Sequence, residues 1–503
     1  MTLSQKDAPG GAGPTVTAVP TGAAVGSAVD SGPNRFGEDL RTALGDREAF
    51  DRHRAANVDS PDVGRLEETL AQEGVEFVYY MIPTIGGRTV AKVAPAGHLR
   101  RMLGTGIAFH RTALTDLQSD RSGYLIGGGI EAREFWALPQ PETLQVLPWD
   151  TTVARVFCRA YEPPQLPGVG GRIMPFDTRA VCELAHSGFT ARTGLELRSG
   201  LEPEMTWAGP GMEVTAKDGQ SPAYQVENLE RMRPVYQRVI RYARALGLDM
   251  IQGDYEDDGQ LELNWHYDRA GLTADRLVTY RQICKQVARE LGLQCSFMPK
   301  PTNGKMGNGC HHNLSLWRGT GEDAENIVDD GRVELHVTER ARHAIAGMLV
   351  HSPGSMLVMG STVNSYKRYW DAGQFAPDEP TWGLDTRAAA VRISSNGRME
   401  FRLPDASVNP YLSHLYLLAS IEDGLRRELD AGKPETAGGD VAGIRLPRTL
   451  GEAIEAFRAD DYLNEAIPEA LTSVYLDLKS DEWARFCGTI TEWEYKQYWE
   501  AIP

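Results

Sequence analysis

The sequence is poor in cysteine, and its few cysteines are not arranged to bind a metal or to form a disulfide framework. None belongs to a CxxC pair, and they lie in apolar stretches such as ARVFC and RQICKQV. Scattered cysteines of this kind are typical of reduced thiols inside a cell. The pattern therefore favours a cytoplasmic protein and argues against a zinc knuckle. The six are Cys158, Cys182, Cys284, Cys295, Cys310 and Cys487.

Long apolar runs and an excess of basic residues are also missing. No stretch approaches the roughly 20 apolar residues that span a bilayer, and the first residues lack the pattern of a secretory signal. Lysine and arginine number 52 against 69 aspartates and glutamates, which gives a net charge of −17. We therefore expect no membrane segment and no nucleic-acid partner. A local group of arginines could still bind an anionic substrate.

The chain divides by composition into a tail and two larger parts. Residues 1–35 are rich in Gly, Pro, Ala, Ser and Thr, which predicts a disordered extension. Strand-like segments dominate residues 65–165, after an amphipathic helix that Ser60 or Asp62 could cap. The Pro- and Gly-rich stretch EPPQLPGVGGRIMPFD resembles a linker. Residues 170–503 then form a larger second domain, as expected for a globular chain of 503 residues.

The second domain alternates helices with charged strands. In a strand, residues i and i+2 share a face. The segments RSGLEPEMTW, QLELNWHY and GRMEFRLPD each carry charge along one face and apolar side chains along the other. Each predicted helix ends near a glycine or proline, as a helix stop should. These helices are predicted at residues 177–194, 225–247, 274–292 and 338–353.

The charged faces of these strands could meet in one cavity. Glu202 and Glu204 share a face of the first strand, Glu262 lies on the second and Glu400 on the third. Taken alone, each alternation fits an ordinary half-exposed sheet. If the faces converge, carboxylates about 4 Å apart repel by about 4 kcal/mol at an effective dielectric near 20. They would then have to protonate or bind cations, and oxygen ligands favour Mg²⁺ or Mn²⁺.

Two further segments add imidazole and positive charge. The stretch GNGCHHNLSL, from Gly307, places two histidines between a glycine turn and a strand, where one could bind a ligand or both could lie at the surface. Arg368, Arg387 and Arg392 could clamp carboxylates or phosphates with paired hydrogen bonds. Cations on one wall and arginines on the other suit phosphoryl transfer from a nucleotide. A phosphate-binding P-loop and a Rossmann glycine motif are absent, so other groups would hold the nucleotide.

This ordered set of motifs resembles the glutamine synthetase superfamily. The motifs EPE, GQLE, FMPKP, GNGCHHNLSLW, NSYKR, RAAAVR, RMEFRLPD and NPYL lie within residues 165–420. The resemblance implies an α+β fold, with a small β-grasp N-terminal domain and a large catalytic domain whose curved antiparallel sheet is flanked by helices. It also implies a homo-oligomer of dodecamer-like stacked rings, with active sites at subunit junctions.

The activity implied by the resemblance is ATP-dependent ligation. ATP phosphorylates the γ-carboxylate of glutamate, and an amine attacks the acyl phosphate to give a γ-glutamyl amide and phosphate. The implied cofactor is Mg²⁺ or Mn²⁺, and the implied partners are ATP, glutamate and an amine.

The resemblance also implies two metal sites. Glu256 is the expected third ligand of the first metal, but the turn EDDGQ is one residue shorter than in relatives, so Asp254 or Asp257 could replace it. Of the adjacent histidines, His311 is the implied ligand, while His312 points to the opposite face and is expected to be packed or hydrogen bonded. The first metal is assigned to Glu204, Glu256 and Glu262, and the second to Glu202, His311 and Glu400.

Substrate-binding roles carry over in the same way. Gly307 lies in the loop that binds the amino acid part of glutamate, Arg368 clamps its α-carboxylate, and Arg402 stabilises the acyl phosphate. The general base that accepts the proton of the amine is either His110 or Asp116, because GIAFHRTALTDLQSD occupies that region. The nucleotide and its phosphates are assigned to Asn313, Ser315, Arg387, Arg392 and Arg398.

One departure from the family pattern concerns the amine. Ammonia-using members place a glutamate immediately before an AP dipeptide, and Phe375 occupies that position here. The sequence is similar in this respect to the branch of type III and γ-glutamylmethylamide-type synthetases. We therefore predict a small amine other than ammonia as acceptor: methylamine, another alkylamine or hydrazine. The alternatives are an ammonia-using glutamine synthetase, another phosphotransferase and an inactive ring-forming scaffold.

Overall fold

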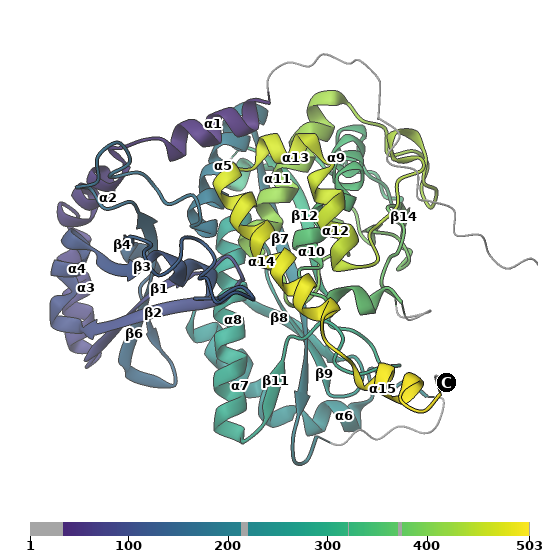
Figure 1. Cartoon of the computed structure of the whole chain (residues 1–503), viewed down its shortest axis with the longest axis horizontal. Helices are drawn as coiled ribbons and strands as arrows, with labels where there is room; N and C mark the ends of the chain where they lie inside the picture. The colour runs from purple at the N-terminus through teal and green to yellow at the C-terminus, as the bar shows by residue number, and fades with distance from the viewer. Residues whose placement is uncertain (1–33, 213–219, 320, 371–374, 502–503) are drawn as a thin grey trace, which may run out of the picture. The chain divides into compact units, whose positions relative to one another are not determined.

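The computed structural model describes residues 34–212, 220–319, 321–370 and 375–501 (Figure 1). Nearly all of the predicted disordered extension therefore lies outside the described residues, and helix α1 (Arg35–Leu44) begins at its last residue. Phe36, Leu40 and Leu44 are buried in α1 at the spacing of an amphipathic helix. Two more helices follow, α2 (Ala49–Val58) and α3 (Asp62–Gln72), and of these three helices only α3 was predicted.

A six-stranded sheet forms the N-terminal part of the described chain. Its strand order is β2-β1-β6-β4-β3, with β5 paired to β6. The predicted hairpin is present as β1 and β2, while β1 and β6 run parallel, so the sheet is mixed. The strands are β1 (Phe77–Pro83), β2 (Thr89–Pro95), β3 (Ile107–His110), β4 (Glu134–Pro139), β5 (Gln145–Leu147) and β6 (Asp150–Tyr161), and α4 (Leu99–Thr105) lies between β2 and β3.

A ten-stranded sheet carries the predicted charged strands. Its main path is β14-β15-β16-β12-β7-β9-β8, and every pairing except β14 with β15 is antiparallel. In β7, Leu201 and Met205 are buried on one face, while Glu202 and Glu204 alternate with them on the other. Its strands are β7 (Leu195–Ala208), β8 (Met250–Tyr255), β9 (Gln260–Trp265), β10 (Asp268–Arg269), β11 (Gln294–Ser296), β12 (Cys310–Arg318), β13 (Glu325–Asn326), β14 (Trp382–Leu384), β15 (Val391–Ile393) and β16 (Met399–Phe401).

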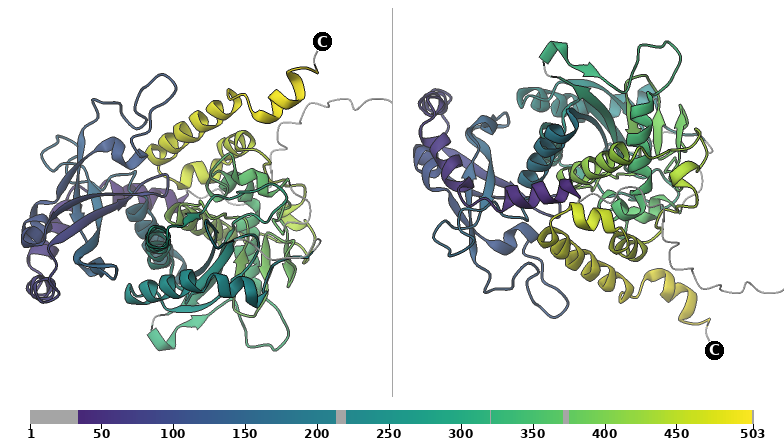
Figure 2. Two further views of the ribbon diagram at one scale, coloured as in Figure 1. Left: turned by 90° about the horizontal axis from the view of Figure 1, so that it is seen from below. Right: turned by 90° about the horizontal axis from the view of Figure 1, so that it is seen from above.

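The helices of the larger part follow the predicted pattern with two corrections. The single helix predicted over 225–247 is interrupted at Met232, two residues before Pro234, whose ring cannot continue a helical hydrogen-bond ladder. The helix predicted over 338–353 ends at Val350, and a new helix begins at Ser352 with Pro353 in its first turn. Figure 2 shows the last two helices, in yellow, running one after the other toward the C-terminus.

The bounds of these helices are α5 (Thr178–Thr193), α6 (Val226–Arg231), α7 (Arg233–Ala245), α8 (Ala270–Leu291), α9 (Glu339–Val350), α10 (Ser352–Met359), α11 (Pro410–Arg427), α12 (Leu450–Arg458), α13 (Asp461–Ala466), α14 (Glu469–Cys487) and α15 (Glu492–Tyr498). None of the helices in the described ranges has both the length and the apolar character needed to cross a membrane. Residues 34–503 form one compact unit, and the division into two domains near residues 165–170 stays a prediction.

Helix α11 lies in the core and touches α9 backbone to backbone. A Cβ atom added at Gly347 would lie 2.1 Å from the carbonyl oxygen of Ser420, and one added at Gly424 would lie 2.2 Å from that of His343. Distances this short are incompatible with any side chain. The two glycines therefore set the separation of α9 and α11, and α11 in turn follows directly on the segment that carries Arg402.

A buried histidine joins the same helical layer through two carboxylates. His351, between α9 and α10, lies with Nδ1 2.8 Å from Asp460 Oδ2 and Nε2 3.0 Å from Asp423 Oδ2. Burial opposes protonation of the ring, but the two carboxylates outweigh it and raise the pKa of His351 to about 9. Arg426 and Arg427 also contact Asp423. The imidazolium thus bridges the C-terminus of α9, α11 and the start of α13.

We expect the variant His351→Gln to unfold several degrees below the unaltered protein at pH 6 to 7. The folded-state pKa lies above that of the unfolded chain, so the stabilisation is complete below the unfolded value and is lost as pH rises through about 9. Thermal unfolding from pH 6 to 9.5 tests this. If the difference in melting temperature between the variant and the unaltered protein stays constant across this pH range, the charge of His351 does not contribute to stability.

Candidate active site

The larger sheet brings the predicted carboxylates to one face through its strand register. Glu202 of β7 is the cross-strand partner of His311 of β12, and Glu204 is the partner of Glu262 in β9. Because all four point to the same face at alternate positions, they line one cavity together with Glu400 of β16. The structure therefore gathers side chains from four separate strands that were predicted to meet.

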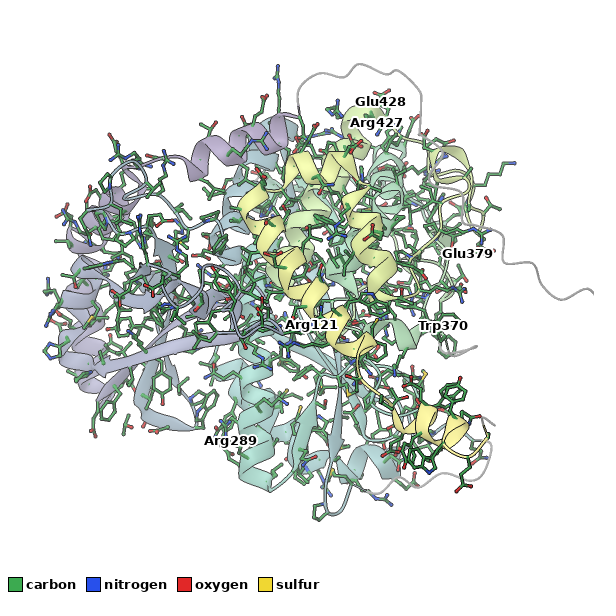
Figure 3. The ribbon with its side chains drawn as sticks, viewed as in Figure 1. Arg121, Arg289, Trp370, Glu379, Arg427 and Glu428 are labelled. Atoms are coloured by element: carbon green, nitrogen blue, oxygen red, sulfur yellow. The ribbon has the colours of Figure 1, made fainter. Side chains whose placement is uncertain are left out.

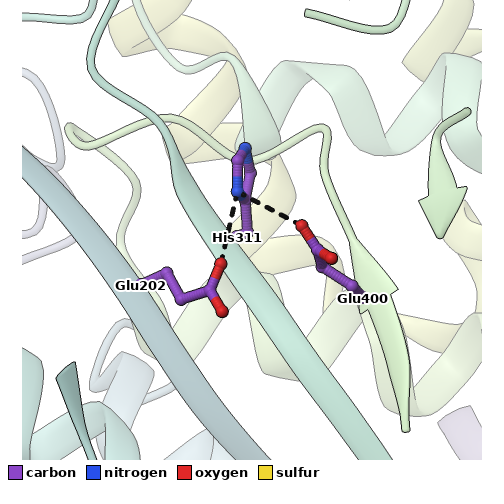
Figure 4. Close-up of side chains that lie close together, drawn as sticks. All are labelled: Glu202, His311 and Glu400. Atoms are coloured by element: carbon purple, nitrogen blue, oxygen red, sulfur yellow. Dashed lines mark ion pairs between the residues drawn. The ribbon is translucent and has the colours of Figure 1, made fainter. Parts of the chain in front are cut away.

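His311, Glu202 and Glu400 form a cluster, shown in Figure 4, that lines this cavity. The Nδ1 atom of His311 lies 3.5 Å from a carboxylate oxygen of each glutamate. One ligand atom from each of the three residues lies within 4.8 Å of the others. Burial, followed by the nearby charge of Arg402, holds the pKa of His311 well below its usual value. A neutral imidazole between two carboxylates has the donor set of a divalent-cation site.

The second group of carboxylates lies on the neighbouring strands. Glu204 accepts hydrogen bonds from the backbone N–H of Gly309 at 2.7 Å and from the Gln260 amide at 2.9 Å. Glu262 accepts one from Asn264 at 2.8 Å. Burial raises the pKa of Glu204, and burial together with the charges of Glu202 and Glu204 raises that of Glu262 well above its usual value. A divalent cation among these oxygens would remove that repulsion, so the residues present fit one.

The end of β8 and the acidic turn after it supply two more carboxylates to the cavity and direct a third elsewhere. Asp254 is the cross-strand partner of Glu262, and its Oδ1 atom is buried without a hydrogen bond. Glu256 also lines the cavity, where burial and the charges of Glu204 and Asp254 raise its pKa to about 7. Asp257 accepts a hydrogen bond from the backbone N–H of Met306 and does not line this cavity. The geometry leaves Glu256 and Asp254 as possible ligands and disfavours Asp257.

Five arginines line the same cavity beside the carboxylates. Arg402 is buried. It donates hydrogen bonds to Glu400 and, at 3.2 Å, to the carbonyl oxygen of Phe375. Arg392 donates to Glu400 at 3.2 Å and to Asp385 at 2.6 Å. Arg392 and Arg402 are thus oriented by acidic residues, while Arg398 donates to the hydroxyl of Ser394. The set consists of Arg368, Arg387, Arg392, Arg398 and Arg402.

Arg368 is held against the glycine loop that precedes β12. A Cβ atom added at Gly307 would lie 2.7 Å from Arg368 Cγ, and one added at Gly309 would lie 3.1 Å from Arg368 Nη2. The Nη1 atom of Arg368 is buried and has no hydrogen-bond partner. A buried, unpaired N–H of a guanidinium is costly, which indicates that an anionic ligand pairs with it in the cavity.

A second cavity, of about 360 Å³, adjoins the first and shares Glu202 and Arg398 with it. It is lined by Asn313 and Ser315, two of the residues assigned to the nucleotide and its phosphates. Asn313 donates to Glu202 at 2.8 Å, and Ser315 accepts from the indole of Trp317 at 2.8 Å. The rings of Trp317 and Tyr267 lie 6.1 Å apart, both lining this cavity. Aromatic surfaces and amide groups beside a phosphate-binding wall suit a nucleoside.

Some assigned residues lie away from both cavities, and others were missed. His110 hydrogen bonds to Thr112 and Asp116 to Thr84, all in the N-terminal part, and neither candidate base lines the described cavity walls. His312 faces the other side of β12, as predicted, and contacts Ser413. Gln260 and Tyr224 also line the first cavity, and neither was predicted as a site residue. Gln260 lies in the GQ dipeptide of a motif that was noted, whereas Tyr224 carries no sequence signal that would have identified it.

Comparisons with known proteins agree in the family they indicate. Residues 178–498 match glutamine synthetase, catalytic domain. A glutamine synthetase of Rhizobium meliloti (strain 1021) is 32% identical over 85% of this chain and 98% of its own. A glutamate–methylamine ligase of Methyloversatilis universalis is 30% identical over 86% and 98%. Among solved structures, a GmaS/ADP complex superposes with a TM-score of 0.75 and 31% identity, over 87% of this chain and 99% of the other.

If Arg368 has its predicted role, we expect Arg368→Ala to raise the KM for glutamate by about 10- to 100-fold, because the predicted charge-assisted pair with the α-carboxylate would be lost. Steady-state kinetics with saturating nucleotide measures the change. Lys367→Ala is the matched control, because Lys367 is the neighbouring cation but is exposed and lines neither cavity. Equal KM values for glutamate in the Arg368 variant and the control would show that Arg368 does not bind the α-carboxylate.

Proposed function

Because this chain belongs to the glutamine synthetase family and is therefore an ATP-dependent carbon–nitrogen ligase, we propose that it joins the γ-carboxylate of L-glutamate to a small amine other than ammonia. The proposed acceptors are methylamine, another alkylamine or hydrazine. The γ-carboxylate oxygen attacks the terminal phosphorus of ATP and ADP leaves. The amine nitrogen then attacks the acyl carbon, phosphate leaves, and a base takes the proton from nitrogen.

The observation that carries the choice of amine is the position of Phe375 at the cavity. Its backbone carbonyl accepts a hydrogen bond from Arg402, so the residue is tied to the proposed acyl-phosphate site. The backbone of Phe375 is left-handed, with φ of 55°, and its side chain is 53% exposed while lining the cavity. An apolar ring there offers no charge to attract ammonium and favours an amine with a carbon substituent.

Within this proposal the arginines bind and orient the reacting groups. Arg368 pairs with the α-carboxylate of glutamate through the guanidinium atom that lacks a protein partner. Arg402, held by Glu400, stabilises the charge that develops on the acyl phosphate. Arg387 and Arg392 lie on the same wall and contact the transferred phosphate. The nucleotide occupies the adjoining cavity with Arg398 at the junction, next to Asn313 and Ser315.

The carboxylate clusters are proposed to hold Mg²⁺ or Mn²⁺. Bound there, such cations neutralise phosphate charge and relieve the repulsion among the carboxylates. The first ion is assigned to Glu204, Glu262 and Glu256 or Asp254, and the second to Glu202, His311 and Glu400. Chelation of divalent ions should accordingly abolish turnover.

The proton acceptor is proposed to come from a second copy of the chain. Neither His110 nor Asp116 lines the cavities described above, so the base must reach the site from elsewhere. Burial raises the pKa of Asp116, against the opposing hydrogen bond from Thr84. A homo-oligomer of stacked rings, with active sites at subunit junctions, would place such a residue against the site of a neighbour.

Ammonia remains the second candidate acceptor. The 32% identity to the glutamine synthetase of Rhizobium meliloti favours it as much as the 30% identity to a methylamine ligase favours an alkylamine. Membership of this ligase family argues against the other two alternatives, which are an inactive ring-forming scaffold and another phosphotransferase that uses the same metal site.

An amine panel tests the proposal directly. Purified protein with glutamate, ATP and Mg²⁺ should release phosphate with a higher kcat/KM for methylamine, a longer alkylamine or hydrazine than for ammonia. Hydroxylamine, as a trapping amine, should give γ-glutamyl hydroxamate, which reports carboxylate activation whatever the natural acceptor. A preference for ammonia would reject the choice of amine, while failure to form hydroxamate would reject the acyl-phosphate route.

We expect Phe375→Glu to shift the ratio of kcat/KM values toward ammonia by about tenfold or more, because a carboxylate at the rim attracts a small cation. Phe375→Gln is the matched control, since glutamine is similar to glutamate in size and polarity but has no charge. If the two variants show the same preference, Phe375 does not select the amine through its lack of charge.

A further inference from the structure

A third cavity lies away from the carboxylate cluster, and the proposed function makes no use of it. It has a volume of about 450 Å³, within the range of small-ligand pockets. One side is formed by the hairpin of β1 and β2, including Tyr79, Met81 and Ala91. The other side is formed by α8 and the residues after β11, including Val278 and Phe297. The floor is therefore apolar and built from two distant parts of the sequence.

The rim of this cavity is positively charged. Arg88, Arg281 and Lys285 all line it, and no aspartate or glutamate is among the described residues that do so. This is unusual in a chain with a net charge of −17. Arg88 is exposed, and its charge acts on the Asp116 carboxyl, whose pKa it lowers. Lys285 donates one hydrogen bond to the carbonyl oxygen of Cys295, and Arg281 Nε is buried without a partner. Gln282 uses its amide oxygen to accept from Arg155 and leaves its N–H₂ group for a ligand.

The cavity is connected to the active site by hydrogen bonds through the backbone. Arg281 donates to the carbonyl oxygens of Ala406 and Val408 at 2.7 and 2.8 Å. The N–H of Ala406 donates to the carbonyl oxygen of Asn308 at 3.0 Å, and Asn308 accepts from Gln260 at 2.9 Å. Gln260 also donates to Glu204. A ligand that moves Arg281 would therefore act on the loop assigned to glutamate and, through Gln260, on the carboxylate of Glu204.

We propose that this cavity is an effector site for a small organic carboxylate with an apolar chain. The carboxylate pairs with Arg88 and Lys285 at the rim, and the chain packs on Tyr79, Val278 and Phe297. An amino acid is disfavoured because no carboxylate in the described lining would accept its ammonium group. The proposal does not depend on which amine the ligase uses.

The experiment uses the full chain in its native assembly and compares three probes of equal chain length. Hexanoate carries the carboxylate, norleucine adds an ammonium group, and 1-hexanol lacks the charge. Hexanoate at millimolar concentration should raise the thermal midpoint saturably and change the KM for glutamate, whereas norleucine and 1-hexanol should do neither. The activity arm is run with hydroxylamine as acceptor, so that it is independent of the natural amine.

Two kinds of variant test the location. Arg88→Gln combined with Lys285→Gln removes the exposed rim charges, and Gln282→Trp fills the cavity from α8. Both should weaken hexanoate binding by about fivefold or more, the first because two charge-assisted contacts are lost and the second because the indole occupies the space of the alkyl chain. Arg289→Gln is the matched control, because Arg289 lies exposed on the same helix but outside the cavity (Figure 3). Binding that is absent, that survives both variants, or that leaves KM unchanged would overturn the proposal.

Discussion

The repulsion among carboxylates gathered on one face of the larger sheet is the constraint on which the rest of the site depends. Glu202 and Glu204 come from β7, Glu262 from the adjacent β9, and Glu400 from β16, which β12 separates from β7. Antiparallel pairing fixes the separations of these strands. In a confined cavity this charge is unfavourable unless cations or arginines balance it. The arginine wall, the neutral His311 and the amide of Gln260 can each be understood as part of that balance.

The same constraint separates the site into residues fixed on the strands of the sheet and residues on loops, which can vary. Groups that handle phosphate and glutamate lie on paired strands or are tied to them, as Arg402 is to Glu400. The residue proposed to select the amine, Phe375, lies outside any strand and reaches the site through its backbone carbonyl. A family can therefore change the acceptor by altering a loop while keeping the activation chemistry on the sheet.

Much of the site could be predicted because alternation along a strand is visible in sequence. The pairs Glu202–Glu204 and Glu400–Arg402 have the two-residue spacing that places them on one face. That these faces meet was an inference from the resemblance, since cross-strand register is not local information. The placement of Asp257 outside the cavity depends on a hydrogen bond from Met306 in a distant loop. Helix α1 was missed although Asn34 caps its N-terminus and Gly45 its C-terminus, while α2 has no side-chain cap that would have revealed it.

The adjacent histidines of β12 show what this construction requires of the chain. His311 faces the carboxylates, while His312 packs against His414 with ring centres 4.9 Å apart. Inserting or deleting one residue within β12 would exchange the two rings and every neighbour along the strand. Insertions and deletions among related chains should for this reason accumulate in the segments that connect the strands and should be rare within the strands.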